Sequence, residues 1–200
     1  MNEALRIILP IYLAVFFLVA FVWRSYLVWK RTGINPYVVG KLNRPIDFVE
    51  NYYPVPTLAI LATTLAYSFL PQVYQYASPI VWLDGFELKV VGLSAMGFAL
   101  LWTATAQMQM GKSWRIGIDP ENKTELVEKG LFAASRNPIF LGMRLALWGF
   151  FLTLPSAVAL AAIVLADLLM QIQVRLEEDF LRGEHGDKYT EFCSRVRRWI

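Results

Sequence analysis

The sequence predicts an all-α integral membrane protein with about five transmembrane helices in a single domain. Of its 200 residues, 56% are apolar and the mean hydropathy is +0.43, whereas soluble domains are about 45–50% apolar. The apolar residues form long runs, which is typical of transmembrane helices. The lysines and arginines gather in three polar segments that five spans would place on one side of the membrane, as the positive-inside rule requires.

The apolar runs define the helices in order. A crossing helix needs about 20 residues, and the predicted spans cover residues 5–29, 54–71, 88–110, 139–153 and 156–175. Pro54 and Pro56 suit the first turn of the second helix, where a missing N–H costs nothing. The fourth span is short, so we expect it to tilt little or to lie beside a thinned or protein-covered region. The first run lacks a small-residue cleavage site, so we expect a retained helix and no secretory signal.

The turn between the last two spans and the distribution of charge predict the topology. Leu154-Pro155-Ser156 permits only a tight turn, so the fourth and fifth spans form an antiparallel hairpin. Fifteen of the 19 lysines and arginines fall within residues 30–52, 111–138 and 175–200. This distribution predicts an outside N-terminus and a cytoplasmic C-terminus. Residues 1–110 then hold three helices, and residues 111–200 hold the loop, the hairpin and the tail.

The tail from residue 176 to 200 is expected to form a charged helix, a turn near Gly183–Gly186 and a short amphipathic helix. Trp199, beside two arginines, is interpreted either as an interfacial anchor or as part of a solvated basic end. A single cysteine excludes an internal disulfide, and a single histidine argues against a zinc site.

Polar residues inside the spans are costly and usually face a partner or a wet cavity. Asp167, Gln171 and Arg175 recur every four residues along the fifth helix. The simplest expectation is an ion pair between Asp167 and Arg144 on the facing helix.

The third helix carries Thr103 and Gln107 on one face, where we expect hydrogen bonds between helices. After it, the segment from Gly111 to Arg115 places two cations and Trp114 at the expected membrane edge. This segment is interpreted either as an interfacial belt or as part of a binding site.

Familiar catalytic signatures are missing from the sequence. It has no GxGxxG, Walker loop, GxSxG or HExxH motif, so a Rossmann-type cofactor domain is not expected. The single histidine also argues against a Ser–His catalytic triad.

The most informative stretch runs from Arg136 to Gly142, and the pair Glu177-Glu178 follows it across the hairpin. The hairpin brings this loop and the carboxylates to the same end. The sequence therefore predicts a polar pocket at a membrane surface, suited to an enzyme that takes a polar cofactor from water and an apolar substrate from lipid.

Residues 111–198 resemble the isoprenylcysteine carboxyl methyltransferase and phospholipid methyltransferase family of membrane enzymes, which use S-adenosylmethionine. The matching residues are Leu126, Gly130, Arg136, Pro138, Phe140, Gly142, Glu177, Glu178, Leu181, Gly186, Tyr189, Phe192 and Val196. The resemblance implies a cytoplasmic cofactor pocket formed by the 111–138 loop, the hairpin and the tail. The implied cofactor-binding residues are Thr124, Glu125, Leu126, Val127, Phe132, Arg136, Asn137, Pro138, Ile139, Phe140 and Glu177.

The chain departs from the family at three positions. Asn137 replaces the usual histidine, and Phe132 replaces a tyrosine. Gln173 stands where the prenylcysteine enzymes have an arginine thought to meet the substrate carboxylate, which weakens the expectation of a prenylcysteine substrate. Arg175, two residues on, lies on a different face and is the alternative cation.

The resemblance implies methyl transfer to a lipophilic acceptor that enters from the bilayer, either a carboxylate, an amine or a hydroxyl. A carboxylate needs no base, and an arginine would orient it. An amine or phenol must lose a proton, for which Glu178 or Asp167 are the candidates. The candidate catalytic residues are therefore Gln173, Arg175 and Glu178.

Two alternatives remain open at this stage. An NADPH-dependent membrane reductase of the sterol or steroid type has a similar hairpin and Arg-x-Pro motif, but the glutamate pair and the chain length favour the methyltransferase. A membrane scaffold without enzymatic activity would use its polar residues only to pair helices. We expect lipids and a lipid-like substrate as partners, with no nucleic acid and no metal. The compact chain favours a bacterial inner membrane, with the pocket facing the cytoplasm.

Overall fold

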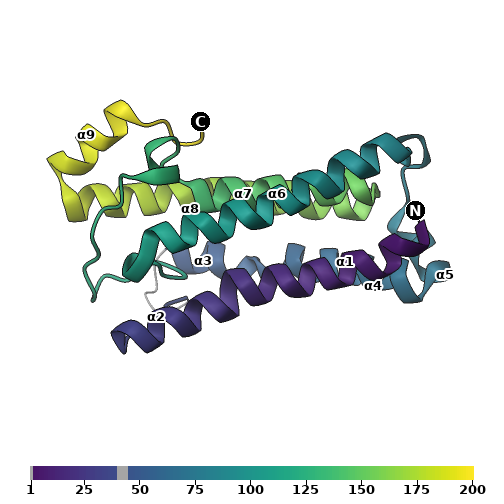
Figure 1. Cartoon of the computed structure of the whole chain (residues 1–200), viewed down its shortest axis with the longest axis horizontal. Coiled ribbons are helices and arrows are strands. Elements are labelled where there is room, and N and C mark those ends of the chain that lie inside the picture. The colour runs from purple at the N-terminus through teal and green to yellow at the C-terminus, as the bar shows by residue number, and fades with distance from the viewer. Residues whose placement is uncertain (1, 40–44) are drawn as a thin grey trace.

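The computed structural model describes residues 2–39 and 45–200, and within these ranges the protein is helical without a β-strand. Two isolated β-bridges join Tyr37 to Ile116 and Pro79 to Ser156. The long helices run along one axis, with the N-terminus and α5 (Pro71–Tyr74) at one end and α9 (Asp187–Arg195) at the other (Figure 1). The predicted all-α fold is confirmed.

Among the described residues, three helices are long and apolar enough to cross a membrane. These are Asn2–Thr32, Phe86–Ser113 and Ala157–His185. The first is a continuous rod of α1 (Asn2–Phe17), the π-helical η1 (Leu18–Trp23) and α2 (Arg24–Thr32). The second joins α6 (Phe86–Met110) to the 3-10 turn η4 (Gly111–Ser113), and the third is α8.

The second and fourth predicted spans are also helices, but they are shorter. They correspond to α4 (Pro54–Phe69) and α7 (Pro138–Thr153), each of 16 residues. Both begin with proline at the first helical position, which tolerates the missing N–H. Five helical rods are therefore present where five spans were predicted, and length and composition support three of them as membrane-crossing.

The remaining elements lie at the two ends. The short helix α3 (Pro45–Tyr52) precedes α4, and the 3-10 turn η5 (Gly130–Ala133) precedes α7. The 3-10 turns η2 (Gln75–Ala77) and η3 (Val81–Leu83) link α5 to α6.

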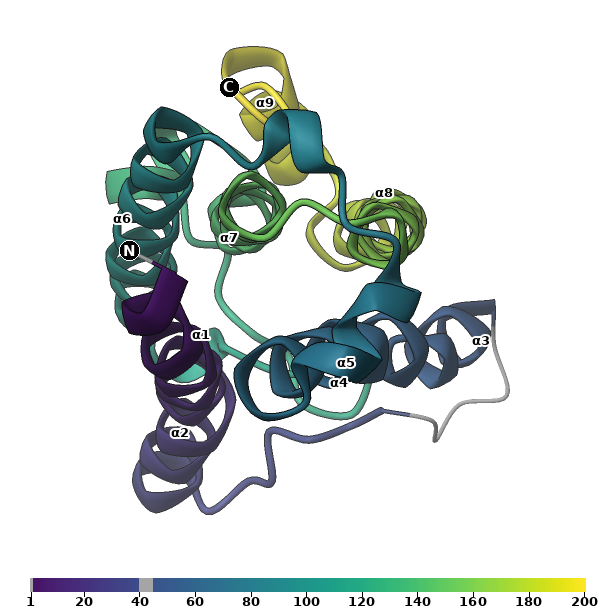
Figure 2. The same cartoon turned by 90° about the vertical axis from the view of Figure 1, so that its right-hand side faces the viewer.

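The five rods are arranged as a ring when viewed along the long axis. Figure 2 shows α6, α7 and α8 in sequence around one side, with α4 and the α1–α2 rod completing the ring. The ring is consistent with packing of α7 on both α6 and α8, and of α4 on both α8 and α1. At the end near the N-terminus, the interior is filled by a core that includes Leu5, Met96, Phe150 and Ile163.

The tightest contact in the ring joins α6 to α7 through glycines. A Cβ on Gly149 would lie 2.8 Å from Gly92 O and 3.0 Å from Met96 Cγ. Near the other end, a Cβ on Gly142 would collide with Thr103 Oγ1. Small residues allow helix backbones to approach closely, as is usual in membrane bundles.

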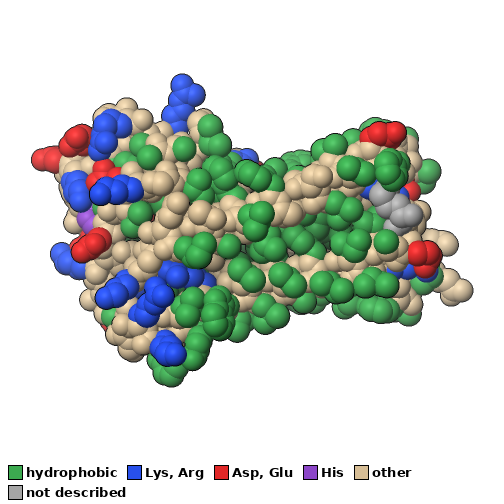
Figure 3. Space-filling view, viewed as in Figure 1, with side chains coloured by type: hydrophobic (Ala, Val, Ile, Leu, Met, Phe, Trp, Pro, Cys, Tyr) green, Lys and Arg blue, Asp and Glu red, His purple; other side chains and the backbone are tan. Residues whose placement is uncertain are grey.

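The outer surface matches a membrane environment. Large apolar side chains are exposed along the rods, for example Ile11, Trp23, Leu101 and Leu168. Figure 3 shows these side chains over the middle of the molecule, with lysines and arginines gathered at the end that carries α2 and α9. Lys41 and Arg44, which the sequence also assigns to this end, lie outside the described residues.

The π-helical turn in the first rod receives a side chain from α6. Gln107 Nε2 donates to Ala20 O at 2.8 Å, and both residues are buried. A π-helical widening leaves carbonyls available to other donors, so a side chain can satisfy one. The hydrogen bond expected between helices is thus confirmed at Gln107, whereas Thr103 Oγ1 has no hydrogen-bond partner among the described residues.

Trp114 does not form an interfacial belt. It is only 3% exposed, and the Arg24 guanidinium lies 6.0 Å from its ring centroid while also donating to Gly111 O. The belt interpretation of this segment is therefore wrong for Trp114, because an arginine from inside the first rod covers the ring.

Candidate active site at the basic end of the bundle

The loop before α7 is held in a defined shape. Asn137 precedes proline, and its φ of −130° and ψ of 54° lie outside the helical region, as the residue before a proline prefers. Trp102 Nε1 on α6 donates to Pro138 O at 2.8 Å. With the loop held in this way, the Asn137 side chain extends from the start of α7 toward α8.

Glu178 is the centre of the polar cluster at this end. It is 2% exposed, and Asn137 Nδ2 donates to its Oε1 at 3.1 Å. Arg198 forms a two-pronged contact, from Nε to both carboxylate oxygens at 3.1 Å and from Nη2 to Oε2 at 2.8 Å. Arg136 Nε lies 3.4 Å from Oε1. A buried carboxylate is thus matched by two cations and an amide, as its desolvation requires.

The backbone of the tail runs alongside the loop. Arg136 N donates to Arg197 O at 3.0 Å, and Ser135 Oγ donates to Arg198 O at 3.3 Å. Asn137 Nδ2 also reaches Arg198 O at 3.3 Å. The loop before α7, the end of α8 and the tail therefore form one connected structure, in which Glu178 is the glutamate that contacts the loop.

An apolar cluster holds the tail against the rest of this end. Tyr189, Phe192 and Val196 are buried together, and Leu126 from the preceding loop packs against them. Burial raises the pKa of the Tyr189 phenol. Exposed ion pairs from Glu128 to Lys188 and Arg195 lie alongside.

Glu177 lies beside Glu178 in the chain but has different partners. Gln173 Nε2 donates to Glu177 Oε1 at 2.8 Å, and Gln173 is 6% exposed. The Tyr53 hydroxyl and the Glu50 carboxylate, from the α3 region, lie near enough to interact electrostatically with the Glu177 carboxylate. This group therefore lies between α8 and α3.

Two buried atoms in the Glu177 group lack partners. Gln173 Oε1 and the Tyr53 hydroxyl have no hydrogen-bond partner among the described residues. Such groups are rare in native structures, because leaving one unpaired costs about 1–3 kcal/mol. They suit a ligand that brings N–H or O–H donors.

The other predicted residues lie around these two groups. Thr124, Leu126 and Val127 are half-buried and Glu125 is exposed, with Ser113 Oγ donating to Glu125 O at 3.1 Å.

Phe132 is buried in η5, whereas Ile139 and Phe140 are half-buried in the first turn of α7. Arg175 is exposed, and its Nη1 donates to Gln171 O at 2.7 Å. Arg175 thus lies apart from the Glu178 cluster.

Sequence reasoning missed Arg198 and Tyr53. In the sequence, Arg198 is one of several basic residues of the tail. It lies on a different element from Glu178, so no helical periodicity relates the two residues. The hydrogen bonds to Glu178 raise the pKa of Arg198, so the residue is firmly charged. Tyr53 carried no signal beyond its place before a helix-starting proline.

The expected intramembrane ion pair is present. Arg144 on α7 binds Asp167 on α8, and Gln171 Nε2 donates to Asp167 Oδ2 at 3.3 Å. Trp199 reaches back over this pair, with the Arg144 guanidinium 4.5 Å from its ring centroid. Trp199 is therefore half-buried on a cation, where an interfacial anchor or a solvated end was expected.

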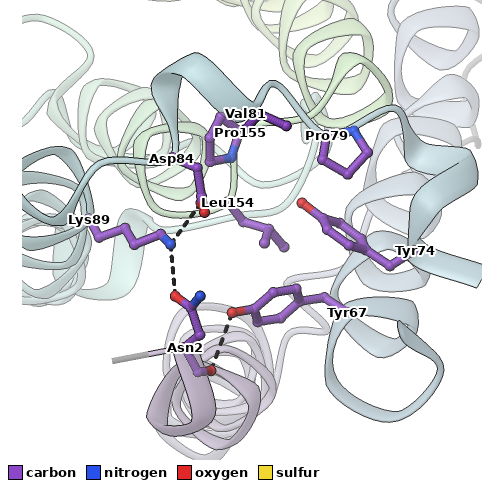
Figure 4. Close-up of a pocket in the computed structure, with 9 residues that line it drawn as sticks. All are labelled: Asn2, Tyr67, Tyr74, Pro79, Val81, Asp84, Lys89, Leu154 and Pro155. Atoms are coloured by element: carbon purple, nitrogen blue, oxygen red, sulfur yellow. Dashed lines mark hydrogen bonds and ion pairs between the residues drawn. The ribbon is translucent and has the colours of Figure 1, made fainter. Parts of the chain in front are cut away.

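A small cavity lies at the opposite end of the bundle. Its volume is about 80 Å³, well below the roughly 300–1,000 Å³ of a typical ligand pocket. Lys89 donates to Asn2 Oδ1 at 2.8 Å and pairs with Asp84 at 2.7 Å, and Tyr67 donates to Asn2 O (Figure 4). Lys89, Asp84, Asn2 and Tyr67 are thus already engaged with one another, and the cavity is small, so the candidate active site remains the basic end.

Comparison with known proteins gives one family. A family profile described as phospholipid methyltransferase matches residues 88–188, just over half of the chain. The match spans nearly all of α6, the whole of α7 and α8 and the segments between them, so it includes Asn137 and both glutamates but ends before Arg198. No curated protein matches the chain.

Proposed function

The chain belongs to the phospholipid methyltransferase family, and on that basis we propose that it transfers a methyl group from S-adenosylmethionine to a lipophilic acceptor. One observation carries the proposal. Within the matched region, Asn137 of the loop meets Glu178 at the charged end of an apolar helical bundle, and Glu177 lies next to Glu178 on α8. A polar cofactor from water and a lipid-like acceptor from the bilayer can both reach this place.

The two unpartnered buried oxygens support this cofactor. S-adenosylmethionine carries an ammonium group, ribose hydroxyls and a sulfonium cation, so it offers donors and positive charge. Gln173 Oε1, the Tyr53 hydroxyl and the Glu177 carboxylate are acceptors that such groups would satisfy. We propose that Glu177 holds the cofactor and that Gln173 orients the Glu177 carboxylate.

The remaining cofactor contacts are proposed from the family pattern. Leu126 of the loop packs against the apolar cluster of the tail, Arg136 and Asn137 contact Glu178, and Phe132 is buried in η5. Phe140, half-buried in the first turn of α7, offers an aromatic face to a cation.

When bound, S-adenosylmethionine supplies an activated methyl group on its sulfonium. The residues of the chain then have to align the acceptor and exclude water. The surroundings of Glu177 favour an amine acceptor over a carboxylate, because Glu177 is acidic while its partner Gln173 and the nearby Tyr53 carry no positive charge. An acceptor carboxylate placed there would be repelled.

The carboxylates predicted as proton acceptors are both engaged. Glu178 is paired with Arg136 and Arg198, and Asp167 is paired with Arg144. Because arginines already contact the oxygens of both carboxylates, neither is available to take a proton from an acceptor. We therefore propose that Glu178 acts by holding the loop and the tail in place.

We further propose that this end of the bundle faces the cytoplasm of a bacterial inner membrane. The gathering of lysines and arginines at the same end as the Glu178 cluster supports the orientation.

The proposal is tested by calorimetric titration of the detergent-purified protein with S-adenosylhomocysteine, with NADPH titrated in parallel. We expect micromolar binding of S-adenosylhomocysteine, lost in Glu177→Ala. Asp179→Ala is the matched control, because Asp179 is an exposed acid two residues away whose partner is the exposed Arg182. Binding of NADPH alone would make the protein a reductase, and binding of neither would make it a scaffold.

A further inference from the structure

We propose that Arg198, which lies outside the family match, is a positioning residue that sets the Asn137 side chain for cofactor binding. The inference rests on the proposed function. It comes from three groups that share one buried carboxylate: Asn137 from the loop, Glu178 from α8 and Arg198 from the tail.

The contacts give Arg198 control over Asn137 in two ways. Its guanidinium contacts both oxygens of Glu178, which fixes the carboxylate that accepts the hydrogen bond from Asn137 Nδ2. Its backbone carbonyl accepts a second hydrogen bond from the same Nδ2 at 3.3 Å. The asparagine amide is therefore held between the main chain of residue 198 and the carboxylate that its side chain orients.

The chemistry of the contact is specific to arginine. A guanidinium presents parallel N–H groups that match a carboxylate, whereas a lysine offers a single point charge. A lysine at position 198 would neutralise Glu178 without fixing the orientation of its carboxylate plane.

The tail does not need Arg198 in order to stay docked. The apolar cluster of Tyr189, Phe192 and Val196 holds it from one side, and the pair between Arg195 and Glu128 adds to this. On the other side, Trp199 packs on Arg144. Removing the Arg198 side chain should therefore leave the tail in place but release Glu178 and Asn137.

The experiment compares cofactor affinity with tail docking in the full-length protein. Affinity for S-adenosylhomocysteine is measured by calorimetry in wild type, Arg198→Ala, Arg198→Lys and Arg197→Ala. Arg197 is the matched control, because it is the adjacent arginine, is exposed, and makes no side-chain hydrogen bond or ion pair with the described residues. Tail docking is measured without ligand by the rate of maleimide labelling of Cys193, the single cysteine, which packs against the tail cluster.

We expect Arg198→Ala to weaken S-adenosylhomocysteine binding about tenfold, as loss of a charge-assisted hydrogen bond would. Arg198→Lys should recover only part of this, Arg197→Ala should match wild type, and Cys193 should label at the wild-type rate throughout. In a double-mutant cycle, Arg198→Ala should have little further effect on an Asn137→Ala background, since it acts through that residue.

Four outcomes would overturn the inference. Unchanged affinity in Arg198→Ala would refute it while leaving the proposed function intact. Lost affinity together with fast Cys193 labelling would mean that Arg198 only fastens the tail. Additive effects in the cycle would mean that Arg198 does not act through Asn137. If wild type itself fails to bind S-adenosylhomocysteine, the proposed function fails and the inference fails with it.

Discussion

At the scale of single residues, the two adjacent glutamates differ in what their carboxylates meet. Glu178 is saturated by Arg136, Arg198 and Asn137, whereas Glu177 accepts from Gln173 and lies near buried oxygens that lack partners. A saturated carboxylate stabilises its surroundings, and one with spare acceptor capacity can take a ligand. The different roles proposed for Glu177 and Glu178 follow from this difference.

The departure at Asn137 is open to a direct test. Asn137→His should preserve or tighten binding of S-adenosylhomocysteine, because an imidazole N–H can still donate to Glu178 from the same loop. Asn137→Ala, which removes both hydrogen bonds of the amide, should weaken binding about tenfold. The measurement is calorimetry on both variants. A large loss of affinity in the histidine variant would show that the loop is arranged differently from that of the family.

At the scale of elements, α6 and α7 form the most closely packed pair. Gly92 and Gly149 let the two backbones meet, and Gly142 continues the contact against Thr103. Since α7 begins at Pro138, directly after Asn137, this packing also fixes the position of the loop along the bundle axis relative to α8.

Gly149→Ala should therefore destabilise the bundle. The added Cβ would meet Gly92 O at 2.8 Å, and overpacking of this kind costs about 1–3 kcal/mol. Gly97→Ala is the control, because Gly97 lies on exposed α6 surface with nothing within 4 Å of an added Cβ. It should be neutral, or stabilising by up to about 1 kcal/mol. Thermal unfolding in detergent distinguishes the two, and equal Tm values would contradict the close approach.

At the scale of the whole molecule, charge divides the bundle into two unlike ends. The end near α2 and α9 carries most of the lysines and arginines, whereas the end near α5 pairs its Lys89 with Asp84. In a membrane this asymmetry selects one orientation.

Cysteine labelling tests this orientation. In a Cys193→Ser background, Glu191→Cys places a thiol on exposed α9, and Tyr76→Cys places one at the far end, where Tyr76 is 85% exposed. A membrane-impermeant maleimide should label position 191 only in inside-out vesicles and position 76 only in right-side-out vesicles. The reverse pattern would invert the proposed topology.

The sequence predicted the rods well because long apolar runs report directly on helices in lipid. It also predicted the pair between Arg144 and Asp167, since two opposite charges on facing helices have few other partners. It placed the end of the last span at residue 175 and predicted a charged helix, a turn near Gly183–Gly186 and a short helix after it. The structure confirms these elements and joins the span and the charged helix in α8, which ends at His185. The apolar run ends at the membrane boundary, but the charged residues beyond it are good helix formers, so the helix continues.

Contacts between irregular segments could not be predicted in the same way. The pairing of Arg198 with Glu178 and the covering of Trp114 by Arg24 join residues without a periodic relation. Such contacts depend on the positions that the loop and the tail take on the packed helices.

The glycine contact between α6 and α7 also bears on how a lipid could enter. Backbones that nearly touch leave no width for an acyl chain between α6 and α7. A hydrocarbon tail that entered the ring would therefore have to pass through another gap between the helices.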